Sequence, residues 1–247
     1  MRIIISPSKK MHVNTDVFAA RAMPCCLDKT ALVLERLKAL SADELKALWK
    51  VSDALLDENI QRLETIDINK AISPALFSYI GLQYESMGTN CLDDEALSYL
   101  DEHLFILSAF YGYLHIFDAI SPYRLEMQSR LSLGSCKNLY DFWAPSYKEL
   151  FNQDGDIILN LASKEYSKAI ERVLDDNKRL VTCSFVEKVG DSYKEKGTYA
   201  KMARGSMVRY LASIKADDLE SVKSFDLGYS FDNELSCDNM LVFVRQK

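Results

Sequence analysis

The sequence has no apolar run that approaches the roughly 18 residues needed to cross a membrane. Its first ten residues, MRIIISPSKK, contain only three consecutive isoleucines before polar residues begin, which is too short for a signal peptide. No internal repeat, low-complexity linker or break in composition divides the 247 residues, a length that can bury a substantial core. The sequence therefore predicts one domain, residues 1–247, in the cytoplasm, with no membrane partner.

Cysteine and histidine are scarce and poorly spaced for a metal or a disulfide framework. The six cysteines include no C-x-x-C pair and the three histidines no H-x-x-x-H pair, so we expect reduced thiols, no metal site and no cofactor. The adjacent pair Cys25 and Cys26 is the one candidate for peroxide sensing or metal binding, although adjacent cysteines rarely make a good chelate.

An excess of positive charge is also missing, because the formal net charge is −6. This balance excludes a protein coated uniformly for nucleic acid, so a DNA-binding role would require the basic residues to gather on one face. Acidic residues crowd 93–102 and 217–238, whereas basic residues concentrate at Lys9 and Lys10 and from Lys194 to Arg209. The sequence therefore allows one local basic surface.

Apolar runs and amphipathic stretches alternate along the chain, which favours the α/β class: a mixed β-sheet enclosed by helices in a single domain. The interval 77–84 is ambiguous between a strand broken at Gly81 and a helix, and Gln153 to Asp156 is the clearest turn. We expect strands at 2–5, 104–107, 157–161, 180–189, 228–231 and 240–245, and helices at 28–40, 93–103, 138–151, 164–174 and 198–214.

Residues 104–127 combine a buried strand, an aromatic turn and paired charges. Gly112 can take a positive φ in that turn, and residues 123–127 alternate as a strand does. Arg124 and Glu126 would then share one face, opposite Tyr123. This pair is either an ion pair at a strand edge or part of a site.

Residues 41–66 predict two short helices joined by a tight turn. Ser41 followed by Glu44 is a capping-box signature. The arrangement is similar to a helix-hairpin-helix module, in which Lys50 and the amides after Ser52 would meet a phosphate. The turn lacks glycine and Asp53 opposes phosphate by its charge, so a plain helical pair packed on the core is an equal alternative.

The predicted helix 198–214 has a basic face. Lys201, Arg204 and Arg209 lie away from its apolar side, with Gly205 between them. Because glycine is about 1 kcal/mol less favourable than alanine in a helix, we interpret Gly205 as allowing a polyanion to approach the backbone. A solvated basic face is the alternative.

Five blocks in order resemble the YaaA family of bacterial peroxide stress proteins. They are ISPSKK at 5–10, LSAFYGYLHIFDAISPYRLEM at 107–127, NLYDFW at 138–143, NLASKEY at 160–166 and KMARGSMVRY at 201–210. The resemblance implies a cytosolic protein of the oxidative-stress response that binds DNA and limits iron-driven damage, without an established catalytic activity. His115 stands where the family pattern has arginine, which removes a fixed positive charge.

Three functional hypotheses follow. The first is a monomer that recognises the structure of DNA rather than the base sequence, with Tyr123 or Tyr111 stacking on an unpaired base. The second is an enzyme for a small phosphorylated or nucleotide-like substrate, in which Lys9 or Lys201 binds the anion and Glu126 is the acid or base. The third is iron sequestration. The residues predicted to contact DNA are Lys9, Lys10, Lys50, Ser52, Tyr123, Arg124, Lys201, Arg204 and Arg209.

Overall fold

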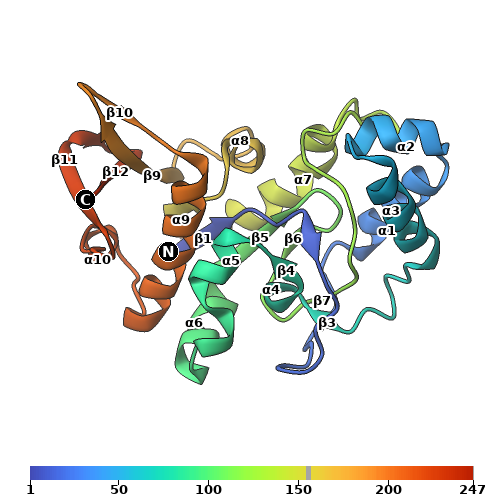
Figure 1. The fold of residues 1–247 in the computed structure, drawn as a ribbon, viewed down its shortest axis with the longest axis horizontal. Coiled ribbons are helices and arrows are strands. Elements are labelled where there is room, and N and C mark those ends of the chain that lie inside the picture. Colours follow the sequence, from blue (N-terminus) through green and yellow to red (C-terminus); the bar gives the residue numbers. More distant parts are fainter. Residues whose placement is uncertain (154–156, 247) are drawn as a thin grey trace.

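The computed structural model describes residues 1–153 and 157–246, and a mixed sheet runs through its centre (Figure 1). Five strands are parallel, one antiparallel strand closes each edge, and β10 (Ser192–Lys194) forms a hairpin with β9. This confirms the α/β class and the mixed sheet. The order is β11 (Tyr229–Cys237), β12 (Met240–Arg245), β9 (Arg179–Val189), β8 (Ile157–Leu161), β1 (Arg2–Ile5), β5 (Leu104–Ser108) and β6 (Gly112–Leu114).

The first strand, β1, lies between β8 and β5, both parallel to it. Its Ile3, Ile4 and Ile5 are fully buried, as expected for a parallel strand covered on both faces. Because β1 and β8 are in register to Ile5 and Leu161, the residues that follow them emerge together at one edge of the sheet. Polar segments 6–10 and 162–165, distant in the sequence, therefore become neighbours.

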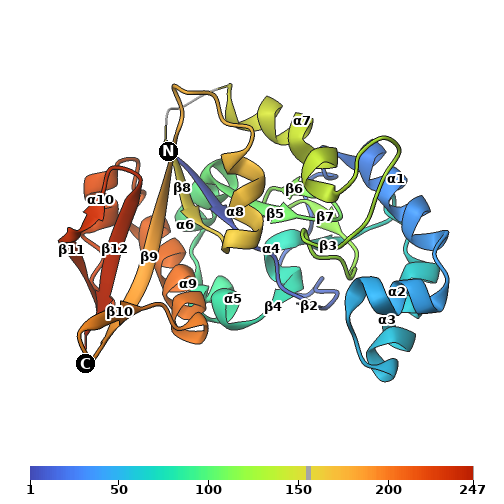
Figure 2. The same ribbon diagram turned by 90° about the horizontal axis from the view of Figure 1, so that it is seen from above.

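Helices cover both sides of the sheet (Figures 1 and 2). On one side α5 (Leu82–Met87) and α6 (Asp94–His103) pack against α9 (Gly197–Ile214), and on the other α7 (Leu139–Phe151) packs against α8 (Lys164–Glu171). The short η1 (Thr89–Cys91) lies between α5 and α6 in the chain, and α10 (Leu219–Lys223) follows α9. None of the helices in the part of the chain that the structure describes is long and apolar enough to cross a membrane.

Three helices, α1 (Leu27–Lys38), α2 (Ala42–Trp49) and α3 (Asp53–Thr65), gather at the end of the molecule opposite β11 and β12 (Figure 1). The predicted capping box is confirmed, because Ser41 and Glu44 exchange side-chain and backbone hydrogen bonds at the start of α2. Lys50 ends α2 in the left-handed conformation, φ 51°, and turns the chain toward α3. Ser52 precedes α3 without a side-chain capping bond.

The interval 77–84 is not one strand. Residues 75–78 form α4 (Ala75–Ser78), a two-residue β4 (Tyr79–Ile80) pairs with β2 (Lys10–Met11), and α5 follows Gly81. Gly81 has φ 153°, which breaks the pattern that side chains alone suggested. A second small sheet pairs β3 (Ser73–Pro74) with β7 (Ala119–Ile120).

Residues 123–127 follow the predicted alternation without forming a strand. Tyr123, Leu125 and Met127 are buried while Arg124 and Glu126 are half-buried, but the segment has no ladder partner. The alternation of side chains correctly predicts which residues are buried, but the predicted strand pairing is wrong. Gly112 has φ 78°, as expected. A larger residue would also not fit there, because the Trp143 ring fills the space of a Cβ. The predicted turn at 153–156 lies outside the described residues from 154 onward.

Candidate functional site

A cavity of about 590 Å³ opens where β1 and β8 end, and we call it the sheet cavity. Its walls come from 6–10, 80–85, 123–126, 163–166 and helix α9. The carboxyl ends of parallel strands are the usual position for ligands in open α/β sheets, and this volume falls within the range of small-ligand sites. The sheet topology therefore brings distant polar segments to one concave surface.

The loop after β1 is held in place by hydrogen bonds to neighbouring segments. The Ser163 amide donates to Ser6 Oγ at 2.8 Å, and the Tyr84 hydroxyl donates to the Ser6 carbonyl at 2.9 Å. Ser8 Oγ also donates to the Ile80 carbonyl. These bonds hold the backbone, so Lys9 and Lys10 extend from an ordered loop at the cavity.

Five cations line the sheet cavity: Lys9, Lys10, Arg124, Lys201 and Arg204. Lys9 Nζ lies 2.8 Å and Arg124 Nη2 3.5 Å from the same oxygen, Glu126 Oε1. Arg204 Nη2 lies 3.2 Å from Glu195 Oε1. Among the described residues, Lys10 and Lys201 have no ion pair. Glu126 and Glu195 therefore neutralise the five cations only in part.

Two of these arginines carry unsatisfied donors. Arg124 and Arg204 have side chains only 14% and 12% exposed, and neither Nε has an acceptor among the described residues. Gln83, in the wall of the same cavity, has an unpartnered Nε2. Buried donors are nearly always satisfied, so these three buried donors are exceptions among the residues of this wall.

Three carboxylates share the sheet cavity: Glu85, Glu126 and Glu165. Burial raises the pKa of Glu165 above its usual value, although the Gln128 amide donates to its Oε1 at 3.1 Å and opposes that effect. The nearby Glu126 charge raises the pKa further. Glu165 therefore holds a proton more readily than an ordinary glutamate does, a consequence of burial that sequence patterns do not reveal.

Tyr123, predicted to stack on a base, belongs to the wall of the sheet cavity but is packed into the core. Tyr123 is 7% exposed, its ring stacks on Phe110, and its hydroxyl bonds Tyr79 at 3.0 Å and Ser108 at 2.8 Å. Burial raises the pKa of Tyr123 to about 12. Tyr111 is fully buried. Both rings are committed to the core, so neither presents a face to a base.

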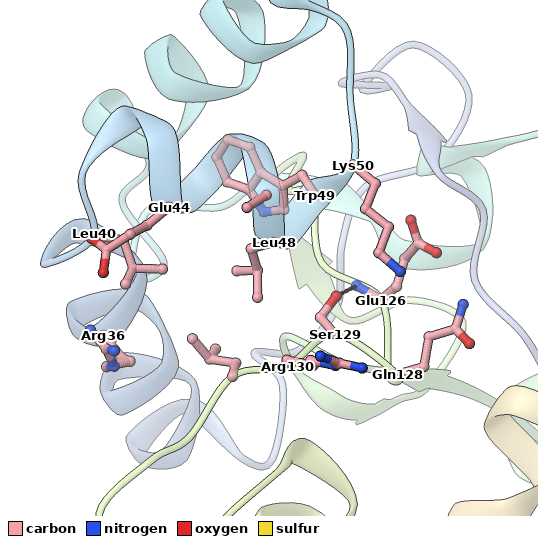
Figure 3. Close-up of a pocket in the computed structure, with 12 residues that line it drawn as sticks. Arg36, Leu40, Glu44, Leu48, Trp49, Lys50, Glu126, Gln128, Ser129 and Arg130 are labelled. Carbon is pink, nitrogen blue, oxygen red and sulfur yellow. Dashed lines mark hydrogen bonds between the residues drawn. The ribbon is translucent and has the colours of Figure 1, made fainter.

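Three other predicted residues lie elsewhere. The Arg209 guanidinium lies against Gly88 and does not line the sheet cavity. Lys50 lines a second cavity of about 600 Å³ bounded by α1, α2 and residues 126–131, which we call the helix cavity (Figure 3). Ser52 lines neither cavity. Glu126 lines both, so the two cavities adjoin at that residue.

The interpretation of Gly205 as a point of polyanion approach is wrong. Gly205 is buried, and a Cβ added to it would overlap the Gln83 carbonyl oxygen. The glycine instead allows α5 and α9 to pack closely. His115 lies beyond β6, where its amide donates to Asp118 Oδ2 at 2.8 Å and its ring packs edge-on to Phe105. It is not part of either cavity wall.

The predicted thiol pair is adjacent to α1. Cys25 is exposed and Cys26 half-buried, and burial raises the pKa of both thiols. A raised pKa lowers the thiolate fraction, which opposes a role in peroxide sensing. Within residues 1–153 and 157–246, no group of three histidine, cysteine, aspartate or glutamate side chains could hold a metal ion.

The fold and the sheet cavity define an α/β protein whose candidate site is a cation-lined cavity at the strand ends. The family model of peroxide stress protein YaaA matches residues 1–235, so the chain belongs to that family, as the five sequence blocks indicated. UPF0246 proteins from Lachnoclostridium phytofermentans and Agathobacter rectalis are 46% and 44% identical to it. The first match spans 99% of this chain and 96% of the relative, and the second spans 100% of this chain and 99% of the relative.

Proposed function

We propose that this member of the peroxide stress family is a cytoplasmic DNA-binding protein, and that the sheet cavity receives backbone phosphates of duplex or non-canonical DNA. Binding would help to limit iron-driven oxidative damage to that DNA. One observation carries the proposal: cations from both ends of the chain line a single cavity in which two guanidinium nitrogens lack acceptors. Arginine and lysine are the usual phosphate ligands in protein–DNA complexes.

The charges have distinct roles in this proposal. Lys10 and Lys201 are exposed and without an ion pair among the described residues, so they would contact phosphate first. Arg124 and Arg204 lie deeper, and the positive charge of their guanidinium groups would attract a phosphate that enters the cavity. Glu126 must release Lys9 for that residue to join them. Contacts to phosphate alone would give binding with little sequence preference.

A comparison of two cations on α9 tests the proposal. Lys201→Gln removes a charge from the sheet cavity, whereas Arg209→Gln removes one from the same helix outside it. In fluorescence anisotropy with a labelled 20-base-pair duplex at about 50 mM salt, we expect Lys201→Gln to weaken binding about three- to tenfold. The loss of one phosphate contact is the reason. Arg209→Gln should bind as the unaltered protein does.

Failure of the proposal would be visible in the same titration. Absence of DNA binding at low salt, or equal weakening by both substitutions, would show that the sheet cavity is not the phosphate site. A forked duplex and a four-way junction, titrated in parallel, would report any preference for DNA structure.

One observation favours a second function, chemistry on a small phosphorylated or nucleotide-like compound. Glu165, with a raised pKa, shares a cavity of nucleotide-compatible size with Lys9 and the arginine donors. Glu126, in contrast, is paired with two cations. Calorimetry with nucleoside monophosphates would test this. Micromolar binding that persists at 300 mM salt and excludes DNA would favour the second function. Iron sequestration has no suitable ligand group among the described residues to support it.

A further inference from the structure

The helix cavity adjoins the sheet cavity at Glu126, and its other walls come from different residues. This cavity has a volume of about 600 Å³ and lies between α1, α2 and the segment from Glu126 to Leu131 (Figure 3). Leu40, Leu48 and Leu131 contribute an apolar wall, together with Trp49. Apolar side chains commonly line small-molecule sites, where they pack against an apolar group of the ligand.

The walls also carry an excess of positive charge. Arg36, Lys50 and Arg130 line the cavity, and none has an ion pair among the described residues. Figure 3 shows Lys50 and Arg130 on the side of Glu126, with Arg36 on the opposite side. These cations remain available to an anion that enters.

The two carboxylates of this cavity are engaged with other groups. Glu44 accepts hydrogen bonds from the Ser41 amide at 2.8 Å and the Ser41 hydroxyl at 3.0 Å, as part of the α2 capping box. Glu126 pairs with Lys9 and Arg124, which line the sheet cavity. The Arg36 charge also contributes to lowering the pKa of Glu44, so Lys50 and Arg130 are the cavity cations with no acidic partner among the described residues.

Trp49 adds an independent observation. It is 3% exposed, yet its Nε1 has no acceptor among the described residues. A buried indole N–H normally has a partner, so the described residues leave this donor of a cavity-lining residue unsatisfied.

We propose that the helix cavity binds a small organic anion, an apolar or aromatic group that carries one phosphate or carboxylate. The apolar group packs on Leu40, Leu48 and Leu131, and the anion meets Lys50 and Arg130. The volume suits a small ligand. This site does not depend on DNA binding at the sheet cavity, and either can fail alone.

Tryptophan fluorescence provides the test, because the chain has two tryptophans and only Trp49 lines this cavity. Trp143 is fully buried and donates to the Ala109 carbonyl at 2.8 Å. The probes for the full-length protein are phenyl phosphate, benzoate, inorganic phosphate and benzyl alcohol. We expect a saturable change with phenyl phosphate or benzoate, and at least tenfold weaker binding of inorganic phosphate and benzyl alcohol. The comparison of the two aromatic anions identifies the preferred acidic group.

Matched substitutions locate the binding. Arg130→Gln and Lys50→Gln, both at exposed side chains, should each weaken the preferred aromatic anion at least threefold. Lys10→Gln removes an equally exposed charge from the sheet cavity and should leave this affinity unchanged. No saturable signal, equal affinity for benzyl alcohol or inorganic phosphate, or a comparable loss with Lys10→Gln would overturn the proposal. None of these results bears on DNA binding.

Discussion

At the scale of single residues, Glu126 controls the charge of both cavities. Its carboxylate is 17% exposed and lies between Lys9 and Arg124, two cations that we propose to attract a phosphate. It is therefore an internal competitor for any anion in the sheet cavity.

Neutralising Glu126 should strengthen DNA binding. Glu126→Gln frees Lys9 and Arg124, and we expect about two- to fivefold tighter binding, because a partly exposed ion pair is worth roughly 0.2–1 kcal/mol. Glu220→Gln, which removes an equal charge paired with Lys223 at the surface, is the matched control. Unchanged or weaker binding by Glu126→Gln, measured by anisotropy at equal salt, would contradict the competitor role.

Asp118 is a second residue whose surroundings dominate its chemistry. It is 2% exposed, and burial raises its pKa to about 6 despite the hydrogen bond from the His115 amide. Charge on His115 lowers the pKa and the nearby Asp101 raises it. Because the folded state binds this proton more tightly than the unfolded state, the free energy of unfolding should fall as pH rises from about 4 to about 6.

The variant Asp118→Asn removes this titration while keeping an acceptor for the His115 amide. Below pH 4 the two proteins should have similar stability, because a protonated aspartic acid resembles asparagine. At pH 7 the variant should gain up to about 3 kcal/mol relative to the unaltered protein, as a shift of about two pKa units requires. Urea unfolding at several pH values measures the difference. A difference that does not change with pH would show that burial does not perturb Asp118.

At the scale of elements, the contact between α5 and α9 positions the cations of the sheet cavity. Gly205 lets α9 approach the backbone of α5 at Gln83. Lys201 lies one turn earlier on α9, and Arg204 directly precedes the glycine. The cavity wall at residues 80–85 and the basic helix are therefore coupled by one close approach.

Adding a methyl group at that contact should destabilise the fold. Gly205→Ala places a Cβ on the Gln83 carbonyl, and we expect a loss of about 1–3 kcal/mol, typical of an overpacked core. Gly197→Ala, at the first residue of the same helix and with open space around its Cβ, should be neutral or slightly stabilising. Equal midpoints of thermal unfolding for the two variants would refute this role for Gly205.

The elements also show how far sequence patterns reach. The buried runs of β1, β5 and β8 and the capping box of α2 could be predicted, because each depends on near neighbours in the chain. Residues 123–127 show the limit. Their alternation reports burial on two faces, but whether a strand pairs there depends on a neighbour that local sequence does not contain.

At the scale of the whole molecule, a net charge of −6 coexists with a local cluster of five cations. Lys9 and Lys201 could be named from composition and motifs. The partners of Arg124 and Arg204 could not, since ion pairs between distant segments depend on side-chain geometry. The burial of Tyr123 also depends on contacts between distant segments, because its hydroxyl forms hydrogen bonds with Tyr79 in β4 and Ser108 in β5.

The helix cavity escaped sequence reasoning entirely. Its cations Arg36 and Arg130 belong to separate segments with no shared motif, and only the packing of α1 and α2 near residues 126–131 brings them to one wall. From sequence, the third cation, Lys50 at the end of α2, is predicted to belong to a helix-hairpin-helix turn instead. That module stays a prediction, and Lys50 now has a defined place in a cavity.

The salt dependence of DNA binding tests the central claim most directly. If four cations of the sheet cavity meet phosphates, log K against log salt for duplex DNA should have a slope of about −3.6. The double variant Lys10→Gln, Lys201→Gln should reduce its magnitude by about 1.8, one contact for each charge removed. A slope near zero, or a slope that the double variant leaves unchanged, would contradict phosphate binding in the sheet cavity.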